Sequence, residues 1–108
     1  MRIVQTLKLK DDPVMIAEYV EVHRNVWPEV KAGIHDVGIT NMEIFLNGSI
    51  LFMIIDTVEP FDREAAFARL ATLPRQAEWE AFVARFQECP EGSSSGEKWQ
   101  EAKRIFKL

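Results

Sequence analysis

The feature that most constrains the fold is the two-residue turn Asn47-Gly48, which stands between two strand-like segments. An Asn-Gly pair readily adopts the positive φ angles that a tight β-hairpin requires. The segment before it, 39–47, alternates between apolar and polar side chains. The segment after it, 49–58, holds the unbroken apolar run ILFMII, which is typical of a strand covered on both faces. The sequence therefore predicts an antiparallel hairpin whose second strand is central in a sheet.

A strand and two helices are predicted before this hairpin. Residues 3–9 alternate in the manner of a half-buried strand. A pair of aspartates before Pro13 predicts a helix start, since a carboxylate can cap the first amides and proline fits the first turn. We expect this helix to run to about Arg24. Because its ring removes an amide donor and clashes with the preceding turn, Pro28 must kink the helix or begin a second one, which Gly38 closes.

Two helices and a final strand are predicted after the hairpin. One helix starts at 60–62 and runs through Ala71, and another starts at Pro74 or Arg75. The apolar side of this last helix consists of Trp79, Phe82, Val83 and Phe86. We predict a short terminal strand at 103–107, because its isoleucine and phenylalanine favour extended structure.

The resulting order, βαββαβ, corresponds to the ferredoxin-like α+β fold, with an antiparallel sheet and helices on one face. The opposite face would expose apolar and aromatic side chains. Two copies packed through their sheets would cover it, so the pattern predicts a homodimer. A chain of 108 residues is long enough for one core, and we expect a single domain spanning 1–108.

Composition narrows the function classes. The formal net charge is -4, with 13 Lys and Arg dispersed among 17 Asp and Glu, so the chain lacks the basic patch of a nucleic-acid-binding protein. No apolar run reaches the roughly 18 residues of a membrane span, and no signal peptide is recognised. The single cysteine, Cys89, forms no internal disulfide and suits a reducing compartment. We expect a cytoplasmic protein without a membrane partner.

The segment EYVEVHRNVWPE carries the richest chemistry in the chain. Tyr19, His23 and Trp27 follow one another at four-residue steps, so on a continuous helix they would share one stripe. An aromatic face suits the apolar face of a sugar, a phenol can bind a hydroxyl, and histidine exchanges protons near neutral pH. This stripe is a candidate surface for handling sugars.

Three segments extend this reading to a family. The runs EYVEVHRNVWPEV, GITNMEIFLN and LFMIID resemble the L-rhamnose mutarotase family over nearly the whole chain. The resemblance implies a dimeric α+β barrel of ferredoxin-like subunits. It also implies an isomerase that interconverts the α and β anomers of a 6-deoxy-L-hexose, L-rhamnose first, with no cofactor and no metal. His23 would be the catalytic proton donor and acceptor. The substrate-binding residues would be Tyr19, Trp27, Asn41, Trp79 and Trp99.

Departures from the family pattern bear on the sugar. Where rhamnose-type sequences usually have a tyrosine in the second strand, this chain has Met42, so a hydroxyl-binding phenol is missing. The carboxy-terminal segment GEKWQEAKRIFKL is also longer, and its Trp99 could form a new pocket wall or dimer contact. L-Fucose is therefore an alternative substrate, since a methyl-sized difference in an apolar pocket is worth only about 1–3 kcal/mol.

Other interpretations stay open. Dimeric α+β barrels also include haem-degrading enzymes and small monooxygenases that use Asn, Trp and His, which Asn41, Trp79 and His23 could supply. A sugar-binding module without catalysis is a third possibility. Trp27 could simply wedge the helix break, and Trp79 could belong to the core. The Gly- and Ser-rich segment 89–98 predicts a loop that is either a lid or a solvated connector.

Overall fold

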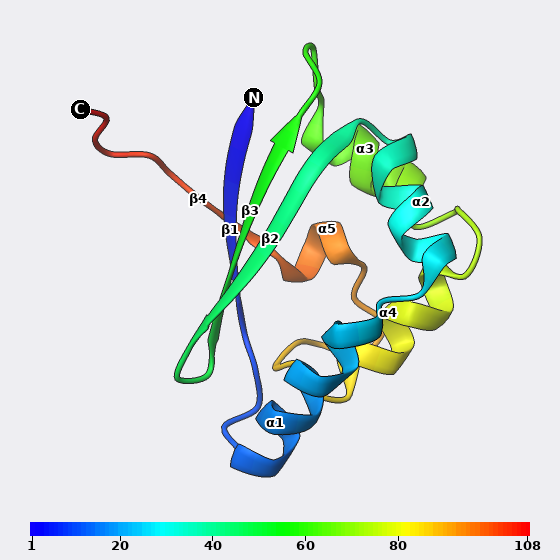
Figure 1. Cartoon of the computed structure of the whole chain (residues 1–108), viewed down its shortest axis with the longest axis vertical. Coiled ribbons are helices and arrows are strands. Elements are labelled where there is room, and N and C mark those ends of the chain that lie inside the picture. The colour runs from blue at the N-terminus through cyan, green and yellow to red at the C-terminus, as the bar shows by residue number, and fades with distance from the viewer.

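The computed structural model describes residues 1–108 as a four-stranded antiparallel sheet with helices packed on one face (Figure 1). The elements in chain order are β1 (Arg2–Lys8), α1 (Pro13–Val22), the 3-10 turn η1 (His23–Asn25), α2 (Pro28–Asp36), β2 (Ile39–Asn47), β3 (Ile50–Thr57), α3 (Arg63–Leu70), α4 (Gln76–Ala84), α5 (Ser95–Lys98) and β4 (Gln100–Ala102). The strand order is β2-β3-β1-β4, and each neighbouring pair is antiparallel. The predicted ferredoxin-like topology is confirmed.

The hairpin forms at the predicted turn. Gly48 has a φ of 63°, and Asn47 pairs with Ile50 across the turn. Strand β3 lies between β2 and β1, so it is central as expected. Its inward side chains Leu51, Met53 and Ile55 are buried. Its other face is only half-buried within one chain, whereas the sequence predicted that both faces would be covered.

Helix boundaries follow the capping and proline signals. The Asp12 carboxylate accepts hydrogen bonds from the first amides of α1, at 2.9 Å from Val14 N, and Pro13 is the first helical residue. Asp62 caps α3 in the same way. Helix α1 ends at Val22, and Pro28 begins α2, so the proline starts a second helix rather than kinking the first. The intervening 3-10 turn holds His23.

Gly38 closes α2 in a backbone conformation that suits only glycine. Its φ is 99°, and an added Cβ would lie 2.8 Å from Cγ2 of Val58. This close passage brings the end of α2 against the end of β3 and turns the chain into β2. The packing therefore couples the helix layer to the sheet at this edge.

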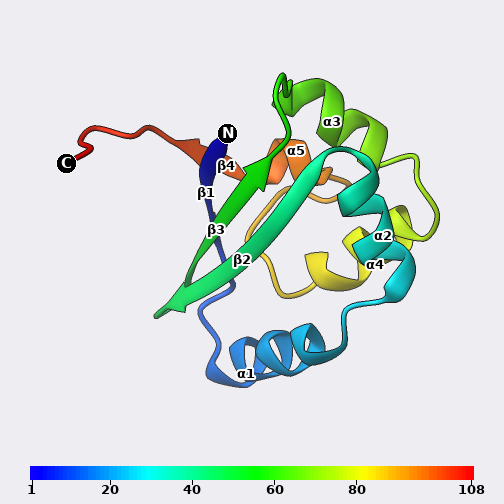
Figure 2. The ribbon, with the colours of Figure 1, turned by 45° about the horizontal axis from the view of Figure 1, so that its top comes forward.

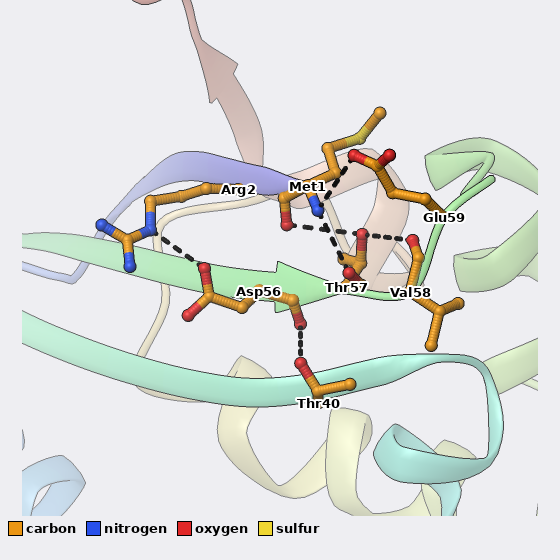
Figure 3. Close-up of polar contacts among 7 residues, drawn as sticks. All are labelled: Met1, Arg2, Thr40, Asp56, Thr57, Val58 and Glu59. Carbon is orange, nitrogen blue, oxygen red and sulfur yellow. Dashed lines mark hydrogen bonds and ion pairs between the residues drawn. The ribbon is translucent and has the colours of Figure 1, made fainter. Parts of the chain in front are cut away.

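Polar contacts tie the start of β1 to the end of β3 (Figure 3). The amino terminus of Met1 donates to the main-chain oxygen of Thr57 at 3.1 Å, and Nε of Arg2 donates to Oδ1 of Asp56 at 2.9 Å. Oγ1 of Thr40 in β2 donates to the main-chain oxygen of Asp56 at 3.1 Å. Three strands are thus fixed at one end of the sheet.

The carboxy-terminal expectations need two corrections. The last strand is β4, which pairs Gln100–Ala102 with β1, and the predicted strand at 103–107 is wrong. Residues 103–108 instead leave the domain on the side of the sheet opposite the helices (Figure 1 and Figure 2). The segment 89–98 is not entirely loop, because its last four residues form α5. That helical turn shapes the site described below.

The core lies between the inner face of the sheet and the helix layer (Figure 2). Its buried side chains from the sheet include Ile3, Leu7, Ile39, Leu51, Met53 and Ile55, and those from the helices include Val30, Phe67, Leu70 and Val83. None of the helices combines the length and apolar character needed to cross a bilayer.

Candidate active site

A cavity lies in this core, between the sheet and the ends of several helices. Its apolar floor is formed by Met42 and Ile44 of β2 and Met53 of β3. Its polar and aromatic walls include Tyr19, His23, Gln76, Trp79, Glu80, Gln87, Ser95, Lys98 and Trp99. The centre of a water-sized sphere can occupy about 90 Å³ of the cavity. One water needs about 10–15 Å³ on that measure, so the cavity has room for a ligand about the size of a sugar ring.

His23 is held in a fixed orientation at the cavity wall. Its Nδ1 lies 2.8 Å from the main-chain oxygen of Tyr19, one turn earlier. Because a carbonyl oxygen only accepts, Nδ1 carries the proton, and in the neutral ring Nε2 has the free lone pair. The imidazole also lies 4.2 Å from the Tyr19 ring and 5.4 Å from the Trp79 ring, centroid to centroid. The helix break at η1 and these rings together fix the imidazole.

The surroundings keep His23 neutral near pH 7. Burial lowers the pKa of its imidazole below the usual value of 6.5, and the hydrogen bond to Tyr19 offsets only part of that effect. A neutral imidazole with a free Nε2 is a proton acceptor at rest. The geometry therefore favours His23 as a base that takes a proton from a ligand in the cavity.

Tyr19 is a hydrogen-bonding group rather than a base. Its side chain is 3% exposed, and burial raises the pKa of the phenol to about 12, with a smaller opposing effect from Gln87. At neutral pH the hydroxyl stays protonated and can donate to, or accept from, a ligand hydroxyl. This placement agrees with the binding role that the family resemblance implies.

Both tryptophans predicted from the second half of the chain line the cavity. Trp79 of α4 and Trp99, which follows α5, are 7% and 4% exposed. Trp79 also packs against His23 and Trp27, so this side chain both belongs to the core and lines the pocket. The two indoles give the cavity flat apolar surfaces of the kind that suit a sugar face.

Trp27 and Asn41 lie outside the cavity. Trp27 stacks on Phe82, with ring centroids 5.8 Å apart. The guanidinium carbon of Arg75 lies 4.1 Å from the centroid of the Trp27 ring. It is therefore packed behind Trp79 rather than beside His23. Asn41 is exposed and pairs with Asp56 in the sheet, and it lines an adjoining hollow that shares His23, Val26, Ile34, Met42 and Ile44 with the cavity. Sugar contact by either residue stays a prediction; the packing of Trp27 does not favour it, whereas Asn41 shares its hollow with His23.

The cavity contains polar residues that the sequence reasoning missed. The buried side-chain atoms without a hydrogen-bond partner in the protein are Oε1 of Gln76, Oε1 of Gln87 and Nζ of Lys98. All three residues line this cavity. Buried polar atoms are normally paired, so three unpaired ones around one space indicate a site for a polar ligand. Gln76 and Glu80 lie one turn apart on α4, and Gln87 follows that helix in a β-bridge with Leu9.

Helix α5 brings Lys98 and Trp99 to the cavity through local contacts. Ser94 and Glu97 form a capping box, and the amide of Ser95 donates to Oε1 of Glu80 at 2.8 Å. A Cβ added to Gly96 would lie 3.2 Å from Cβ of Phe67, so a larger residue would require Phe67 to shift by a few tenths of an ångström. The spacing Ser-x-x-Glu was the sequence signal for this turn.

Fold and cavity together define a small ferredoxin-like α+β domain whose pocket combines an imidazole, a phenol, two amides and an ammonium with aromatic faces. A family model described as L-rhamnose mutarotase matches residues 2–108. The chain therefore belongs to the L-rhamnose mutarotase family. Membership makes it an isomerase-type enzyme that acts on sugar anomers.

Individual relatives agree with this assignment. The chain is 46% identical to an L-fucose mutarotase of Xanthomonas campestris, over 99% of this chain and 87% of that protein. It is 29% identical to an L-rhamnose mutarotase of Acidiphilium cryptum, over 94% and 93%. The fold matches the crystal structure of an L-rhamnose mutarotase from Formosa agariphila with a TM-score of 0.75 at 22% identity, covering 100% of this chain and 98% of that one. A polyketide cyclase from Streptomyces glaucescens shares the fold with a TM-score of 0.61 at 13% identity, over 100% and 96%.

Proposed function

We propose that this protein interconverts the α and β anomers of a 6-deoxy-L-hexose pyranose within the cavity beside His23. The observation that carries the proposal is the neutral, oriented imidazole in a space lined by unpaired polar atoms and two indoles. Anomer exchange needs only proton transfers at two oxygens, the C1 hydroxyl and the ring oxygen. A positioned acid or base contributes about 10²- to 10⁴-fold to such a step.

The steps follow from the state of the imidazole. Nε2 of His23 takes the proton of the C1 hydroxyl while an acid protonates the ring oxygen, and the bond between C1 and the ring oxygen breaks. The resulting aldehyde rotates about the bond from C1 to C2. The ring oxygen then attacks the other face of C1, the imidazolium returns its proton to the new C1 oxygen, and the acid recovers its proton. No net proton or electron is exchanged with the solvent.

Binding is assigned to the groups that stay neutral. The phenol of Tyr19 and the amides of Gln76 and Gln87 can bind sugar hydroxyls, and such contacts satisfy the buried oxygen atoms that lack partners. Trp79 and Trp99 contact the apolar face of the ring. The sheet floor of methionine and isoleucine suits the methyl group at C6, which distinguishes a deoxy sugar from an ordinary hexose.

L-Fucose and L-rhamnose are the two sugars to compare. Both carry a methyl group at C5, and they differ in configuration at C2 and C4. Met42 in the floor supports L-fucose, because it replaces the phenol typical of rhamnose-type sequences, and the 46% identical relative is named for L-fucose. L-Rhamnose is supported by the family description.

Saturation-transfer NMR with each sugar tests the proposal, because it measures exchange between the two anomeric protons directly. We expect wild-type protein to accelerate the exchange and His23→Gln to lose about 10²- to 10⁴-fold of the rate while keeping its fold. His35→Gln is the matched control, because His35 lies on the surface at the end of α2. Sugar binding without any acceleration would instead identify a non-catalytic binding module.

We also propose that the active form is a homodimer joined through the outer faces of the sheets. That face carries Val4, Phe45, Phe52 and Ile54 side by side in the strand register, and Phe45 is 51% exposed. The tail beyond β4 leaves the domain on the same side and exposes Ile105 and Phe106 by 93% and 75% (Figure 1). A second copy placed on this face would cover both apolar surfaces.

A further inference from the structure

We propose that Lys98 is the second proton-transfer group of the site, the acid that protonates the ring oxygen while His23 accepts the proton of the C1 hydroxyl. This inference rests on the mutarotase function proposed above. It follows from one juxtaposition: the unpaired buried ammonium of the chain belongs to a residue that lines the same cavity as the oriented imidazole.

Burial of Lys98 without a partner is unusual enough to need a reason. The residue is 6% exposed, and its Nζ has no hydrogen-bond partner in the protein. Lysine is almost never fully buried unless paired, because removing an ammonium from water is costly. On so short a helix, the Lys98 side chain could easily have reached the surface. The cost of removing the ammonium from water is offset if the ammonium binds a ligand. The ring oxygen of a pyranose can accept a hydrogen bond from it.

The local structure keeps this ammonium in place. The capping box of Ser94 and Glu97 orders the turn, and the amide of Ser95 is bonded to Oε1 of Glu80. Gly96 lets the turn pack tightly against Phe67, at a distance where an added Cβ would require a small shift. The backbone that carries Lys98 is therefore fixed before any ligand enters, and the side chain is buried at the cavity wall, as pre-organised acid catalysis requires.

The charges around Lys98 set its acidity. Burial lowers the pKa of the ammonium below its usual value of 10.5, and Glu80 of α4 and the thiol of Cys89 offset part of that effect. Glu97, on the same helix, accepts hydrogen bonds from Ser94. Tyr19 of α1 and His23 of η1 also line the cavity. Desolvation thus moves the pKa of Lys98 down toward neutral pH, where a proton donor works best.

The complete cycle balances between the two residues. Lys98 gives a proton to the ring oxygen as Nε2 of His23 takes the C1 proton, and the bond between C1 and the ring oxygen breaks. A neutral amine and an imidazolium then flank the open-chain aldehyde. After rotation about C1–C2, the amine takes back the proton of the C5 hydroxyl as that oxygen attacks C1, and the imidazolium protonates the new C1 oxygen.

Two substitutions separate proton transfer from simple charge. Lys98→Met removes the ammonium at nearly constant length, and Lys98→Arg keeps a positive charge on a group that does not release its proton in proteins. We expect both variants to lower the anomer exchange rate about 10²- to 10⁴-fold while still binding the sugar. Lys10→Met, at an exposed position between β1 and α1, is the control and should keep the wild-type rate.

The pH profile gives an independent reading. Wild-type activity should fall at alkaline pH as Lys98 loses its proton, and the residual activity of Lys98→Met should lack that fall. Lys98→Met should also unfold at the same or higher urea concentration than wild type, because it removes an unpaired buried charge. If Lys98→Met does not fold, Lys98→Arg decides by its rate.

The outcomes distinguish this inference from the proposed function. If Lys98→Met or Lys98→Arg keeps a rate within about threefold of wild type while His23→Gln has lost it, Lys98 is not the acid and the mutarotase proposal stands. If wild-type protein accelerates neither sugar, the proposed function fails and the inference fails with it.

Discussion

Nη2 of Arg63, on the first turn of α3, donates a hydrogen bond of 2.8 Å to the main-chain oxygen of Trp99. Nε of the same guanidinium donates to Oε1 of Gln5 at 2.6 Å, and Gln5 in β1 is fully buried. One half-buried side chain thus joins the central sheet to the segment that forms a cavity wall. Arg63 therefore helps to hold Trp99 in the cavity wall.

Replacing Arg63 by methionine should therefore both destabilise the fold and loosen the site. Two buried acceptors would lose a charged donor, and we expect a loss of about 2–3 kcal/mol in the free energy of unfolding, measured in urea. The KM for the sugar should rise more than kcat falls. Arg69→Met is the matched control, because the ion pair of Arg69 with Asp36 is 57% exposed on both sides and should contribute less than about 1 kcal/mol. Equal effects of the two substitutions would contradict this account.

The stability of the protein should fall as the solution becomes acidic, because of His23. Its folded-state pKa lies below 6.5, so below that pH the unfolded chain binds a proton that the folded chain does not. Stability is therefore full above about pH 6.5 and is lost as the pH falls toward the folded-state pKa. The urea midpoint of wild type should drop more between pH 7.5 and pH 5.5 than that of His23→Gln. Parallel drops in both proteins, with His35→Gln as control, would show that other groups cause the loss.

Met42 should influence which sugar is preferred. It lies in the cavity floor, and the family resemblance implies a tyrosine at its place in rhamnose-type sequences. We expect Met42→Tyr to change the ratio of kcat/KM for L-rhamnose to that for L-fucose by about 10-fold or more in favour of L-rhamnose, since one new hydroxyl contact has an energy of this order. The ratio is measured by saturation-transfer NMR on both sugars. Ile44→Val, also in the floor, is the control for a change of shape alone, and an equal shift there would argue against a specific phenol contact.

The tail should matter for association rather than for folding of the domain. Removing residues 103–108 deletes exposed apolar side chains and no element of the sheet. We expect the shortened protein to dissociate at about 10-fold or higher concentrations than the full chain, measured by sedimentation velocity over a dilution series. A full-length chain with Ile105→Ser and Phe106→Ser should behave like the deletion. If both variants associate as wild type does, the tail takes no part in the interface.

Elements that depend on neighbouring residues were predictable from the sequence. The Asn47-Gly48 turn, the aspartate caps and the break at Pro28 each rest on local conformational preference, and the structure confirms them. The strand predicted at 103–107 failed for a non-local reason. Isoleucine and phenylalanine favour extended structure, but a strand needs a partner, and the chain leaves β1 after Ala102.

Site residues that are close in the chain could be predicted from the sequence, whereas those brought together by the tertiary fold could not. His23 and Tyr19 stay together because they are one turn apart. Trp27 does not join them, since the stripe assumed a continuous helix and the chain changes to a 3-10 turn at His23. Asn41 is not in the cavity wall because the register of β2 shifts between Ile39 and Asn41, which makes Met42 the inward residue; Asn41 lines the adjoining hollow instead. Gln76, Gln87 and Lys98 were missed because polar side chains on an apolar helix face or in a serine-rich segment do not reveal burial by their type.

The helix layer and the sheet contribute different kinds of side chain to the cavity. Its proton-handling and hydroxyl-binding groups come from helices and turns, whereas its floor comes from Met42, Ile44 and Met53 on the sheet. Side chains on that floor can be exchanged for others of similar volume without moving the imidazole, because the strands are fixed by their own ladders. Such a division would let lineages acquire a new sugar by a few substitutions in the floor while inheriting the chemistry unchanged.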